Sequence, residues 1–520
     1  MENQENPFKN TLPERTGPYK TAELRERLFA QDERLIDAAN KLAMTIRALP
    51  RDPDYPDIEP RALVVGGFAR DTVLGKHPKD IDLEIYGVSP DRLESILNQL
   101  FPERVNTVGR AFGILKVSLG DGVEFDVSIP RRESKTGSGH TGFAVSGDPG
   151  MKVEEAAERR DFTMNSICAD PLTGEFIDPF NGLQDIHDRV LRVTNAERFQ
   201  DDPLRVYRAV QFAARMELTV EDKSLELMRE MVERGDMEEL SKERVLEEIK
   251  KLLLKAEKPS IGLELMRELG LLGKYFPELD ALVGLPQDKE WHPEGDAWKH
   301  TLQVVDWAAK IIRDPRYAFS ADEKFSVMLG ALCHDLGKPA VTKEIDGRIR
   351  SIGHEEAGLE PTKALCERWG FPHDIQRSAE LITTQHMKPS SFIRAFENGE
   401  MEESGLANAL RKLLKKLHPM GWKELLAVCE ADWRGSALPG TERGAHPTTE
   451  KFAEIVEKYK LDAEPTKPLV QGRDLIDLGI KQGKAIGNIV RRIEDMRDAG
   501  EITTREQALE KMRELVAGLG

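Results

Sequence analysis

Two aspartates one residue apart, Asp80 and Asp82, follow an apolar run that ends in the pair Gly66-Gly67. In a β-strand, residues i and i+2 point to the same face, so a strand here presents two carboxylates side by side while Ile81 faces the core. Paired carboxylates, together with substrate phosphates, are typical ligands of Mg²⁺, and glycines let the backbone approach a phosphate closely. The pattern predicts metal-assisted phosphoryl or nucleotidyl transfer.

Each part taken singly has a plainer explanation, because Asp-x-Asp pairs are common and a Gly-Gly pair usually marks a turn. Their order carries more weight, since three further segments follow at Arg159–Ile167 (RRDFTMNSI), Ile177–Asp185 (IDPFNGLQD) and Asp201–Arg208 (DDPLRVYR). Together the four segments resemble the ordered motifs of class II nucleotidyltransferases in the polymerase-β superfamily. That family contains CCA-adding tRNA nucleotidyltransferases and bacterial poly(A) polymerases, and the chain is most similar to the bacterial CCA-adding type that carries an HD domain.

The resemblance implies in-line attack of a tRNA 3′-hydroxyl on the α-phosphate of CTP or ATP. Asp80 and Asp82 would hold Mg²⁺ for this reaction. Asp126 is the candidate third carboxylate from a neighbouring strand, and Glu124, which shares its face, is the rival. The catalytic residues expected from the sequence are therefore Asp80, Asp82 and Asp126.

Other residues of the four motifs are expected to contact the nucleotide. Gly66, Gly67 and Arg70 would contact the triphosphate, although Arg70 could instead pair with an acid such as Asp71. Gly182 would provide hinge freedom as the pocket changes from C to A. The expected nucleotide-binding set is Gly66, Gly67, Arg70, Arg160, Asp161, Asp202, Arg205 and Arg208.

Base choice follows from hydrogen-bond chemistry. Cytosine and adenine both present an amino donor beside a ring-nitrogen acceptor, whereas uracil and guanine present a carbonyl beside an N–H. One carboxylate and one guanidinium therefore accept C and A and refuse U and G. Asp202 and Arg205 are three residues apart on a predicted helix and so share a face. Spacing alone would make them a surface ion pair, but the resemblance assigns them to the nucleobase; Asp201 stands where the family usually has Glu.

Histidines indicate a second site, because six of the eleven in the chain lie between residues 292 and 386. Adjacent His334 and Asp335 can both reach one metal ion, offering nitrogen and anionic oxygen. The region resembles HD-type metal phosphohydrolases, which implies phosphatase or 2′,3′-cyclic phosphodiesterase activity through metal-bound hydroxide. Mixed nitrogen and oxygen ligands admit Mn²⁺, Ni²⁺, Mg²⁺ or Fe, whereas His292 and His373 are interpreted as structural. The implied ligands are His300, His334, Asp335 and Asp432, with His354 and His386 at a second metal position.

A chain of 520 residues is too long for one core and predicts three or four domains. Residues 1–60 read as an N-terminal extension with one amphipathic helix over 21–49, and residues 61–150 as a small α/β head with a mixed sheet. A helical neck and body over 151–290, a helical HD domain over 291–435 and a helical tail over 436–520 are expected to follow. The fold class is thus α+β, and residues 136–142 read as a flexible loop.

The net charge of −17 argues mildly against nucleic-acid binding, because phosphate contacts need Lys and Arg. Basic clusters at 131–132, 159–160, 411–412 and 415–416 could still form a tRNA-binding face, or be ordinary solvated helix faces. Four scattered cysteines, no signal-peptide pattern and no apolar run of about 18 residues predict a cytoplasmic protein without a membrane segment. The expected partners are the tRNA 3′ end, CTP and ATP, with no obligatory protein partner.

Three other interpretations stay open from the sequence alone. A poly(A) polymerase, or an enzyme that adds only A or only CC, would share the four motifs. A poly(A) polymerase is expected to have a strongly basic C-terminal extension and no HD motif, whereas the segment from Arg491 onward holds slightly more acids than bases. An HD phosphohydrolase with a non-catalytic RNA-binding head, or a non-catalytic scaffold, is opposed by the intact Asp80, Asp82, Asp202 and Arg205.

Overall fold

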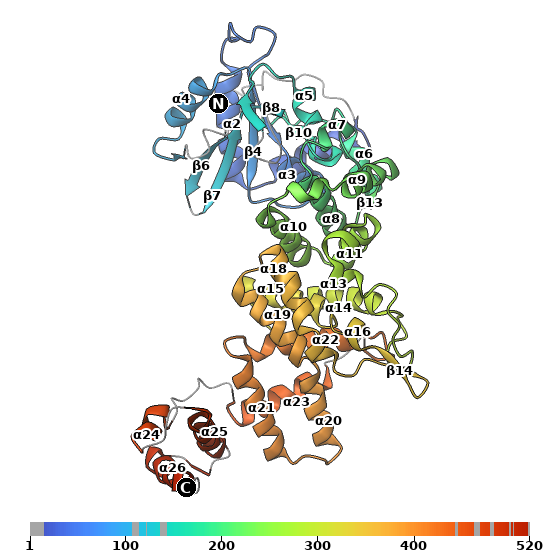
Figure 1. The fold of residues 1–520 in the computed structure, drawn as a ribbon. Helices are drawn as coiled ribbons and strands as arrows, with labels where there is room; N and C mark the ends of the chain where they lie inside the picture. Colours follow the sequence, from blue (N-terminus) through green and yellow to red (C-terminus); the bar gives the residue numbers. More distant parts are fainter. Residues whose placement is uncertain are drawn as a thin grey trace. The chain divides into compact units, whose positions relative to one another are not determined.

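The computed structural model describes residues 15–106, 114–120, 122–135, 143–441, 446–461, 469–478, 483–498, 501–502 and 504–517. The loop expected over 136–142 lies outside these residues. The chain forms two compact units, Met1–Tyr275 and Phe276–Gly520 (Figure 1). Among the described residues, no helix combines the length and the apolar character needed to cross a membrane.

The first unit is built on a seven-stranded sheet with the order β11-β10-β3-β4-β7-β6-β5. Only β4 and β7 pair in parallel within it, so the sheet is mixed, as expected. The strands are β3 (Arg61–Val65), β4 (Ile81–Tyr86), β5 (Val105–Asn106), β6 (Ile114–Gly120), β7 (Val123–Ser128), β10 (Cys168–Ala169) and β11 (Phe176–Ile177). A separate antiparallel pair, β8 (Arg131–Lys135) and β9 (Phe143–Gly147), follows β7 in the chain.

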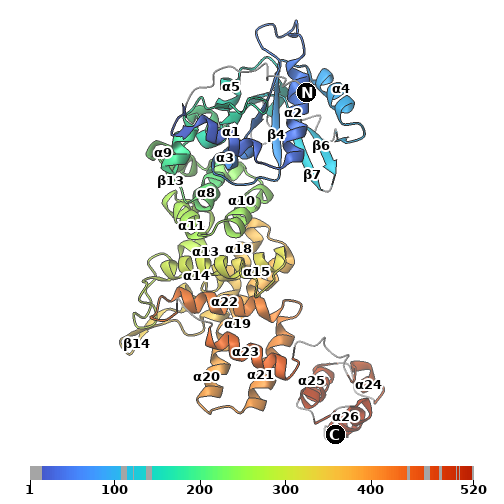
Figure 2. The same ribbon diagram turned by 180° about the vertical axis from the view of Figure 1, so that it is seen from behind.

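The central strand β4 carries Asp82, one of the predicted catalytic carboxylates. Every residue of its sequence IDLEIY is buried except Asp82, so the strand is covered on both faces along most of its length. Helix α3 (Gly67–Val73) contacts β3 and β4, and α2 (Glu33–Arg47) packs on β3. Figure 2 shows α2 and α3 with β4. Asp82 is therefore the one residue of β4 that is not packed into the core, which leaves its carboxylate accessible to a ligand.

The N-terminal residues expected to form one helix over 21–49 form two helices, α1 (Thr21–Phe29) and α2 (Glu33–Arg47). Ala30 ends the first helix, and the Asp32 side chain accepts a hydrogen bond from the Arg34 backbone N–H at the start of the second. An acid at the N-cap satisfies a free backbone donor, so Asp32 starts a new helix where apolar spacing alone suggested continuity. The leucine spacing identified the buried faces correctly but could not reveal the break.

The rest of the first unit is mostly helical, and α8, α10 and α11 pack together. The helices are α4 (Pro90–Leu100), α5 (Val153–Glu158), α6 (Gly182–Asp188), α7 (Ala196–Phe199), α8 (Leu204–Met216), α9 (Asp222–Arg234), α10 (Lys242–Lys255), α11 (Pro259–Glu268) and α12 (Leu271–Tyr275). Short strands β12 (Val190–Leu191) and β13 (Thr219–Val220) pair in parallel beside them.

Four helices in mutual contact form the centre of the second unit: α14 (Ala297–Ile311), α15 (Ala321–Cys333), α19 (His373–Gln385) and α22 (Trp422–Gly435). Helix α15 begins with a capping box between Ser320 and Glu323 and is buried on all sides from Phe325 onward, as suits a central helix. Around it lie α13 (Pro277–Asp280), α16 (Lys338–Val341), α17 (His354–Ala357), α18 (Leu359–Trp369), α20 (Met387–Glu397), α21 (Glu403–Leu417), and the hairpin β14 (Lys343–Ile345) and β15 (Arg348–Arg350).

The segment expected as a helical tail from residue 436 is helical but divides in two. Helix α23 (Pro447–Lys458) packs against α20, α21 and α22. Helices α24 (Gly472–Ile476), α25 (Lys484–Asp498) and α26 (Arg505–Ala517) share their own apolar cluster, which includes Leu475, Ile493 and Met512. The α+β class predicted from the sequence is confirmed.

His446, just before α23, is buried against the indole of Trp433, with 4.9 Å between ring centroids. Burial lowers the pKa of His446 to about 4, because the charged imidazolium would lose its hydration; the nearby Arg434 also lowers it, while Glu430 and Asp432 oppose the shift. All six tryptophans of the chain lie in the second unit.

Candidate functional site

The first site lies where three central strands of the mixed sheet come together. Asp82 on β4 is directly beside Asp126 on the parallel strand β7, and on its other side pairs with Val65 at the end of β3. Asp80 is exposed and precedes β4 by one residue. Of the two rivals on β7, Asp126 is the register partner of Asp82, whereas Glu124 lies two residues away along the strand. The structure therefore brings Asp82 and Asp126 together and favours Asp126 over Glu124.

Electrostatics at this edge favour a cation. The pKa of Asp82 is raised, first because the surrounding protein desolvates its carboxyl group; Arg160 opposes the shift, and the charges of Asp126 and Asp80 add to it. The Lys116 ammonium lies 2.9 Å from Asp126 Oδ1 and occupies a position where a cation is attracted. Asp82 and Asp126, which are register partners next to a tethered ammonium, offer carboxylate oxygens of the kind that suits a divalent ion such as Mg²⁺.

Gly66 faces the same carboxylates. Its φ of +67° belongs to the left-handed region that favours glycine, and a Cβ there would lie 3.6 Å from both Asp82 Oδ2 and Arg160 Nη1. A Cβ on Gly67 would lie 3.6 Å from Arg70 Nη2. The turn between β3 and α3 thus keeps the backbone bare beside the acids, where a phosphate would have to approach.

A buried polar network connects the first two motifs. Arg70 donates to Asp71 Oδ1 at 2.8 Å, which is the alternative pairing expected from the sequence, and to Asn165 Oδ1 at 2.7 Å. Asn165 donates in turn to Asp161 Oδ1 at 2.8 Å, and Arg208 donates to Asp161 Oδ2 at 2.7 Å. Desolvation opposes ionisation of Asp161, but the Arg208 charge and these hydrogen bonds outweigh it and lower its pKa.

This network places Arg70, Asp161 and Arg208 in positions that support the site. The guanidinium groups of Arg70, Arg208 and Arg215 lie 5.2, 5.3 and 5.7 Å from the ring centroid of Phe212. Such a collection of positive charge around one buried ring suits an anionic ligand nearby. Direct contact of Arg70 with the triphosphate stays a prediction.

The expected base-reading pair is arranged differently from the sequence prediction. Helix α8 begins at Leu204, so Asp202 precedes the helix and accepts from the Leu204 backbone N–H at 3.2 Å. Proline at position 203 explains this, because it can stand at a helix start but lacks the N–H that an interior position requires. The other carboxylate oxygen of Asp202 accepts from Arg244 Nη2 at 2.8 Å. Arg205 donates to the carbonyl oxygen of Arg159 at 2.9 Å, which ties the base motif to the ribose motif.

The second site gathers all six predicted metal ligands in the interior of the second unit. His300 Nε2 lies 2.9 Å from Asp432 Oδ1 and 3.8 Å from Asp335 Oδ2. Asp335 Oδ2 is also 3.2 Å from His334 Nε2, and its other oxygen is 3.5 Å from His354 Nε2. Burial opposes ionisation of Asp335, but the neighbouring His334 imidazole and the Lys338 ammonium outweigh it and hold the pKa of Asp335 well below its usual range.

Three of these histidines are oriented by backbone carbonyls. The Nδ1 atoms of His334, His354 and His386 each donate to a carbonyl three residues earlier in the chain, at 2.8, 2.9 and 2.9 Å. A carbonyl only accepts, so Nδ1 carries the proton and Nε2 presents a lone pair. His354 Nε2 and His386 Nε2 nevertheless lie 3.3 Å apart. Two lone pairs at this distance repel each other unless a cation lies between or beside them, so the donors fit bound metal.

Burial strengthens this conclusion. It lowers the pKa of His386 to about 4, and the neighbouring His334 and His354 add to the shift. The Nε2 atom of His334 is buried and has no hydrogen-bond partner among the described residues. Neutral imidazoles with directed Nε2 lone pairs are the form in which histidine binds divalent metals.

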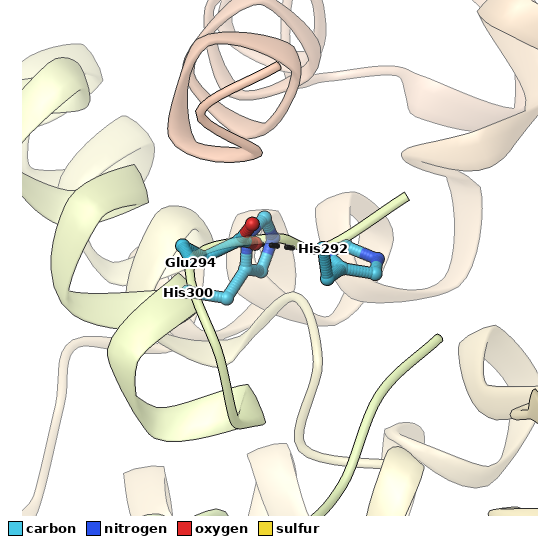
Figure 3. A group of neighbouring side chains, drawn as sticks. All are labelled: His292, Glu294 and His300. Atoms are coloured by element: carbon cyan, nitrogen blue, oxygen red, sulfur yellow. Dashed lines mark hydrogen bonds and ion pairs between the residues drawn. The ribbon is translucent and has the colours of Figure 1, made fainter. Parts of the chain in front are cut away.

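Glu294 is a functional residue that the sequence analysis missed. Its side chain is fully buried, and one oxygen accepts from His292 Nδ1 and from His300 Nδ1, both at 2.8 Å (Figure 3). Burial opposes protonation of His300, but the hydrogen bonds to Asp432 and Glu294 raise its pKa to about 9. A carboxylate behind a ligand histidine fixes its orientation. The available signal was an acid six residues before a predicted ligand.

The two histidines interpreted as structural differ from each other. His292 is half-buried, shares the Glu294 carboxylate and lines a cavity of about 580 Å³. Asp335, His354, His386 and Asp432 line the same cavity, so the metal ligands open onto it. His373 is exposed at the start of α19, away from the cluster.

Comparisons with family models find three matching segments in the chain. Three family models match: the poly A polymerase head domain over residues 62–192, the probable RNA and SrmB-binding site of polymerase A over 217–283, and the HD domain over 297–419. The fold and sites thus define a nucleotidyltransferase head joined to an RNA-binding region and an HD domain.

A multifunctional CCA protein of Stenotrophomonas maltophilia is 35% identical to the chain over 428 residues, covering 82% of the chain and 95% of that protein. The corresponding protein of Pasteurella multocida is 36% identical over 394 residues, with 74% and 86% covered. The chain belongs to the family of multifunctional CCA proteins. It is therefore an enzyme of the nucleotidyltransferase class, as the four ordered motifs predicted.

Solved structures share the fold. The Bacillus stearothermophilus CCA-adding enzyme in complex with CTP superimposes with a TM-score of 0.60 at 20% identity, over 94% of the chain and 99% of the enzyme. The Thermotoga maritima CCA-adding enzyme complexed with tRNA gives 0.55 at 19% identity, over 96% and 98%. At this identity the likeness concerns the fold.

Proposed function

We propose that the first unit adds and repairs the 3′-terminal CCA of tRNA from CTP and ATP, and that the second unit is a metal-dependent phosphohydrolase. The observation that carries the first part is the strand register that sets Asp82 beside Asp126 next to Gly66. Membership of the multifunctional CCA family supports the substrates, as do structures of CCA-adding enzymes with CTP, ATP and tRNA.

In the transfer reaction, Asp80, Asp82 and Asp126 would hold Mg²⁺. When bound, the metal lowers the pKa of the attacking 3′-hydroxyl and stabilises the pyrophosphate leaving group. Arg160, beside Gly66, faces the phosphates. Lys116 releases Asp126 when a stronger cation takes its place.

Base selection belongs to Asp202 and Arg205. Their carboxylate and guanidinium match the donor and acceptor shared by C and A. Arg244 orients the Asp202 carboxylate, and the Arg159 carbonyl orients the Arg205 guanidinium. The two readers are thus fixed before the nucleotide arrives, which lowers the entropy cost of base recognition.

In the second unit, His300, His334, Asp335, His354, His386 and Asp432 would hold one or two divalent ions, with Mn²⁺, Ni²⁺, Mg²⁺ or Fe admitted by the ligand types. The metal supplies an activated water for attack on a phosphate ester, as in a phosphatase or a 2′,3′-cyclic phosphodiesterase. Glu294 fixes His300. Lys338, whose ammonium lies 2.7 Å from Asp335 Oδ2, offers positive charge to a phosphate in the cavity.

The cytoplasm is the compartment we propose, because the four cysteines are free and buried in the structure, as suits a reducing environment. Poly(A) addition and partial addition of A or CC are the alternative activities of the first unit. A non-catalytic head is disfavoured because neighbouring strands set Asp82 beside Asp126, an arrangement of carboxylates that suits a bound divalent cation.

The decisive experiment incubates the protein with tRNA transcripts that lack CCA, CA or A, supplies CTP, ATP or both, and sequences the products. Addition of exactly the missing residues supports CCA addition; long A tails or a stop after CC would identify an alternative. Asp80→Ala and Asp126→Asn should abolish addition and leave phosphatase activity, whereas Asp335→Ala should do the converse. Glu124→Gln is the matched control, because Glu124 also faces Lys116 but lies off the site. Intact addition by Asp80→Ala would refute the assignment.

A further inference from the structure

Three large apolar side chains are exposed around the cavity onto which the predicted metal ligands of the second unit open. Trp291 is 57% exposed, Ile352 70% and Met387 38%, and all three line that cavity of about 580 Å³. Of the six tryptophans in the chain, only Trp291 is exposed. Single exposed apolar residues are common, but a group around one concave site marks a binding surface.

Donors to an anion lie in the same cavity. Arg348 and Arg350 of strand β15 line it; Arg348 is paired with Asp288 and Glu290, whereas Arg350 forms no ion pair with any residue that the structure describes. An arginine without an acidic partner is available to a phosphate.

Gln287 supplies an independent indication of a ligand. It is only 8% exposed, and its Oε1 accepts from the Lys338 ammonium, which fixes the orientation of the amide. The Gln287 Nε2 group is then an N–H donor that has no hydrogen-bond partner within the described structure. Gln287 borders the cavity. A buried unsatisfied donor is costly, and an acceptor oxygen in the cavity would relieve that cost.

We infer that this cavity binds the terminal nucleotide of its phosphate-ester substrate, with the base stacked on Trp291 beside Ile352 and Met387 and the phosphate held by Arg350 and Gln287. The inference rests on the proposed phosphohydrolase function and names the residues that give it specificity. The cavity volume lies within the range of about 300–1,000 Å³ that is typical of small-ligand sites.

The same cavity does not read the base. Of its other polar side chains outside the metal ligands, Asp288 holds Arg348, His292 donates to Glu294, Ser351 bonds to Thr342, and Glu355 Oε2 lies 3.5 Å from His354 Nδ1. Stacking accepts any base because every base has a π-face. The second unit therefore selects nucleotides over simple phosphate esters but treats purines and pyrimidines alike.

The test compares hydrolysis of adenosine 2′-monophosphate, cytidine 2′-monophosphate and glycerol 2-phosphate, which has no base. Trp291→Ala should raise KM for both nucleotides by about 10- to 100-fold with kcat and the glycerol 2-phosphate reaction unchanged, and Trp291→Phe should restore KM. Gln287→Leu should raise KM for all three substrates. Ile345→Ala is the control, because Ile345 is an apolar side chain, 36% exposed, on the hairpin that carries Arg350, but it does not line the cavity.

Binding is measured separately, by quenching of tryptophan fluorescence with adenosine 2′-monophosphate in wild type and in Trp291→Phe. Quenching that depends on Trp291 supports the inference even if the protein hydrolyses none of the substrates, a result that would refute only the proposed hydrolase function. Should Trp291→Ala fail to fold, Ile352→Ala gives the same comparison with a smaller rise in KM. An unchanged nucleotide KM, an equal loss on glycerol 2-phosphate, or a large preference between the two bases would overturn the inference.

Discussion

Replacing Glu294 by Gln tests the second metal site without touching a ligand. The change keeps the size of the side chain and an oxygen that can accept, but removes the negative charge behind His300. In the structure, one oxygen of the Glu294 carboxylate accepts hydrogen bonds from His292 Nδ1 and His300 Nδ1, both at 2.8 Å. Hydrogen bonds to an ionised acceptor are roughly twice as strong as neutral ones.

The expected cost can be worked from this geometry. Loss of a partner behind a ligand histidine typically lowers metal affinity by about 10- to 100-fold, which equals roughly 1.4 to 2.7 kcal/mol. Glu294 also helps to raise the pKa of His300 to about 9. A neutral amide in its place therefore makes the imidazole nitrogen a poorer electron-pair donor to a metal ion. We expect Glu294→Gln to fall within that range and Glu294→Ala at its upper end.

The assay is calorimetric titration of the metal-free protein with Mn²⁺, together with phosphatase rates as a function of Mn²⁺ concentration. Glu290→Gln is the control, since Glu290 is exposed nearby and pairs with Arg348 rather than with a ligand histidine. CCA addition should be the same in all variants. Equal Mn²⁺ affinity in wild type and Glu294→Gln would refute the role assigned to this carboxylate.

Three further changes test other parts of the chain. Arg244→Ala should weaken discrimination against UTP by tenfold, about 1.4 kcal/mol, because it frees the Asp202 carboxylate; misincorporation of U into tRNA measures this. Gly182→Ala should destabilise the first unit by about 3 kcal/mol or more, since its Cβ would lie 2.2 Å from the Thr163 carbonyl oxygen; urea unfolding followed by circular dichroism measures it. Because folded His446 stays neutral down to about pH 4 while unfolded histidine takes a proton near pH 6.5, the second unit should lose about 2 kcal/mol by pH 5; tryptophan fluorescence in urea measures the loss.

Each of these three predictions has an outcome that would contradict it. Unchanged UTP rejection by Arg244→Ala would mean that Asp202 is oriented by other contacts. A Gly182→Ala protein as stable as wild type would show that the α6 backbone moves away readily, as a hinge would. His446→Gln should remove its share of the acid sensitivity, and an identical pH profile would exclude His446 as the source.

Part of the first site could be predicted from the sequence, because strand periodicity is local. Two-residue spacing predicted that Asp80 and Asp82 share one strand face, but β4 begins at Ile81, so Asp80 lies just before the strand. Strand register is a tertiary property, so only the structure could place Asp126 rather than Glu124 beside Asp82. The helix prediction at Asp202 was wrong because the helix begins at Leu204, and the proline at 203 sets that boundary.

In the second site, the ligands could be predicted from the sequence, but the groups that orient them could not. His334 and Asp335 are adjacent in the chain and therefore visible in the sequence, and the four remaining ligands followed from the resemblance. The groups that orient the ligands were invisible, because carbonyl acceptors carry no sequence signal. Glu294 was recognisable in type but not in role, since only folding brings its carboxylate to both His292 and His300.

The ammonium that Lys116 holds against Asp126 has a consequence for assembly of the head. It acts as a counter-ion within the protein, so the repulsion between Asp82 and Asp126 is reduced before any Mg²⁺ binds. The nitrogen atoms of His354 and His386 have no such substitute between them. A chelator should therefore loosen the histidine-rich interior while the sheet keeps its order, and newly made chains in a metal-poor cell would mature their two halves at different times.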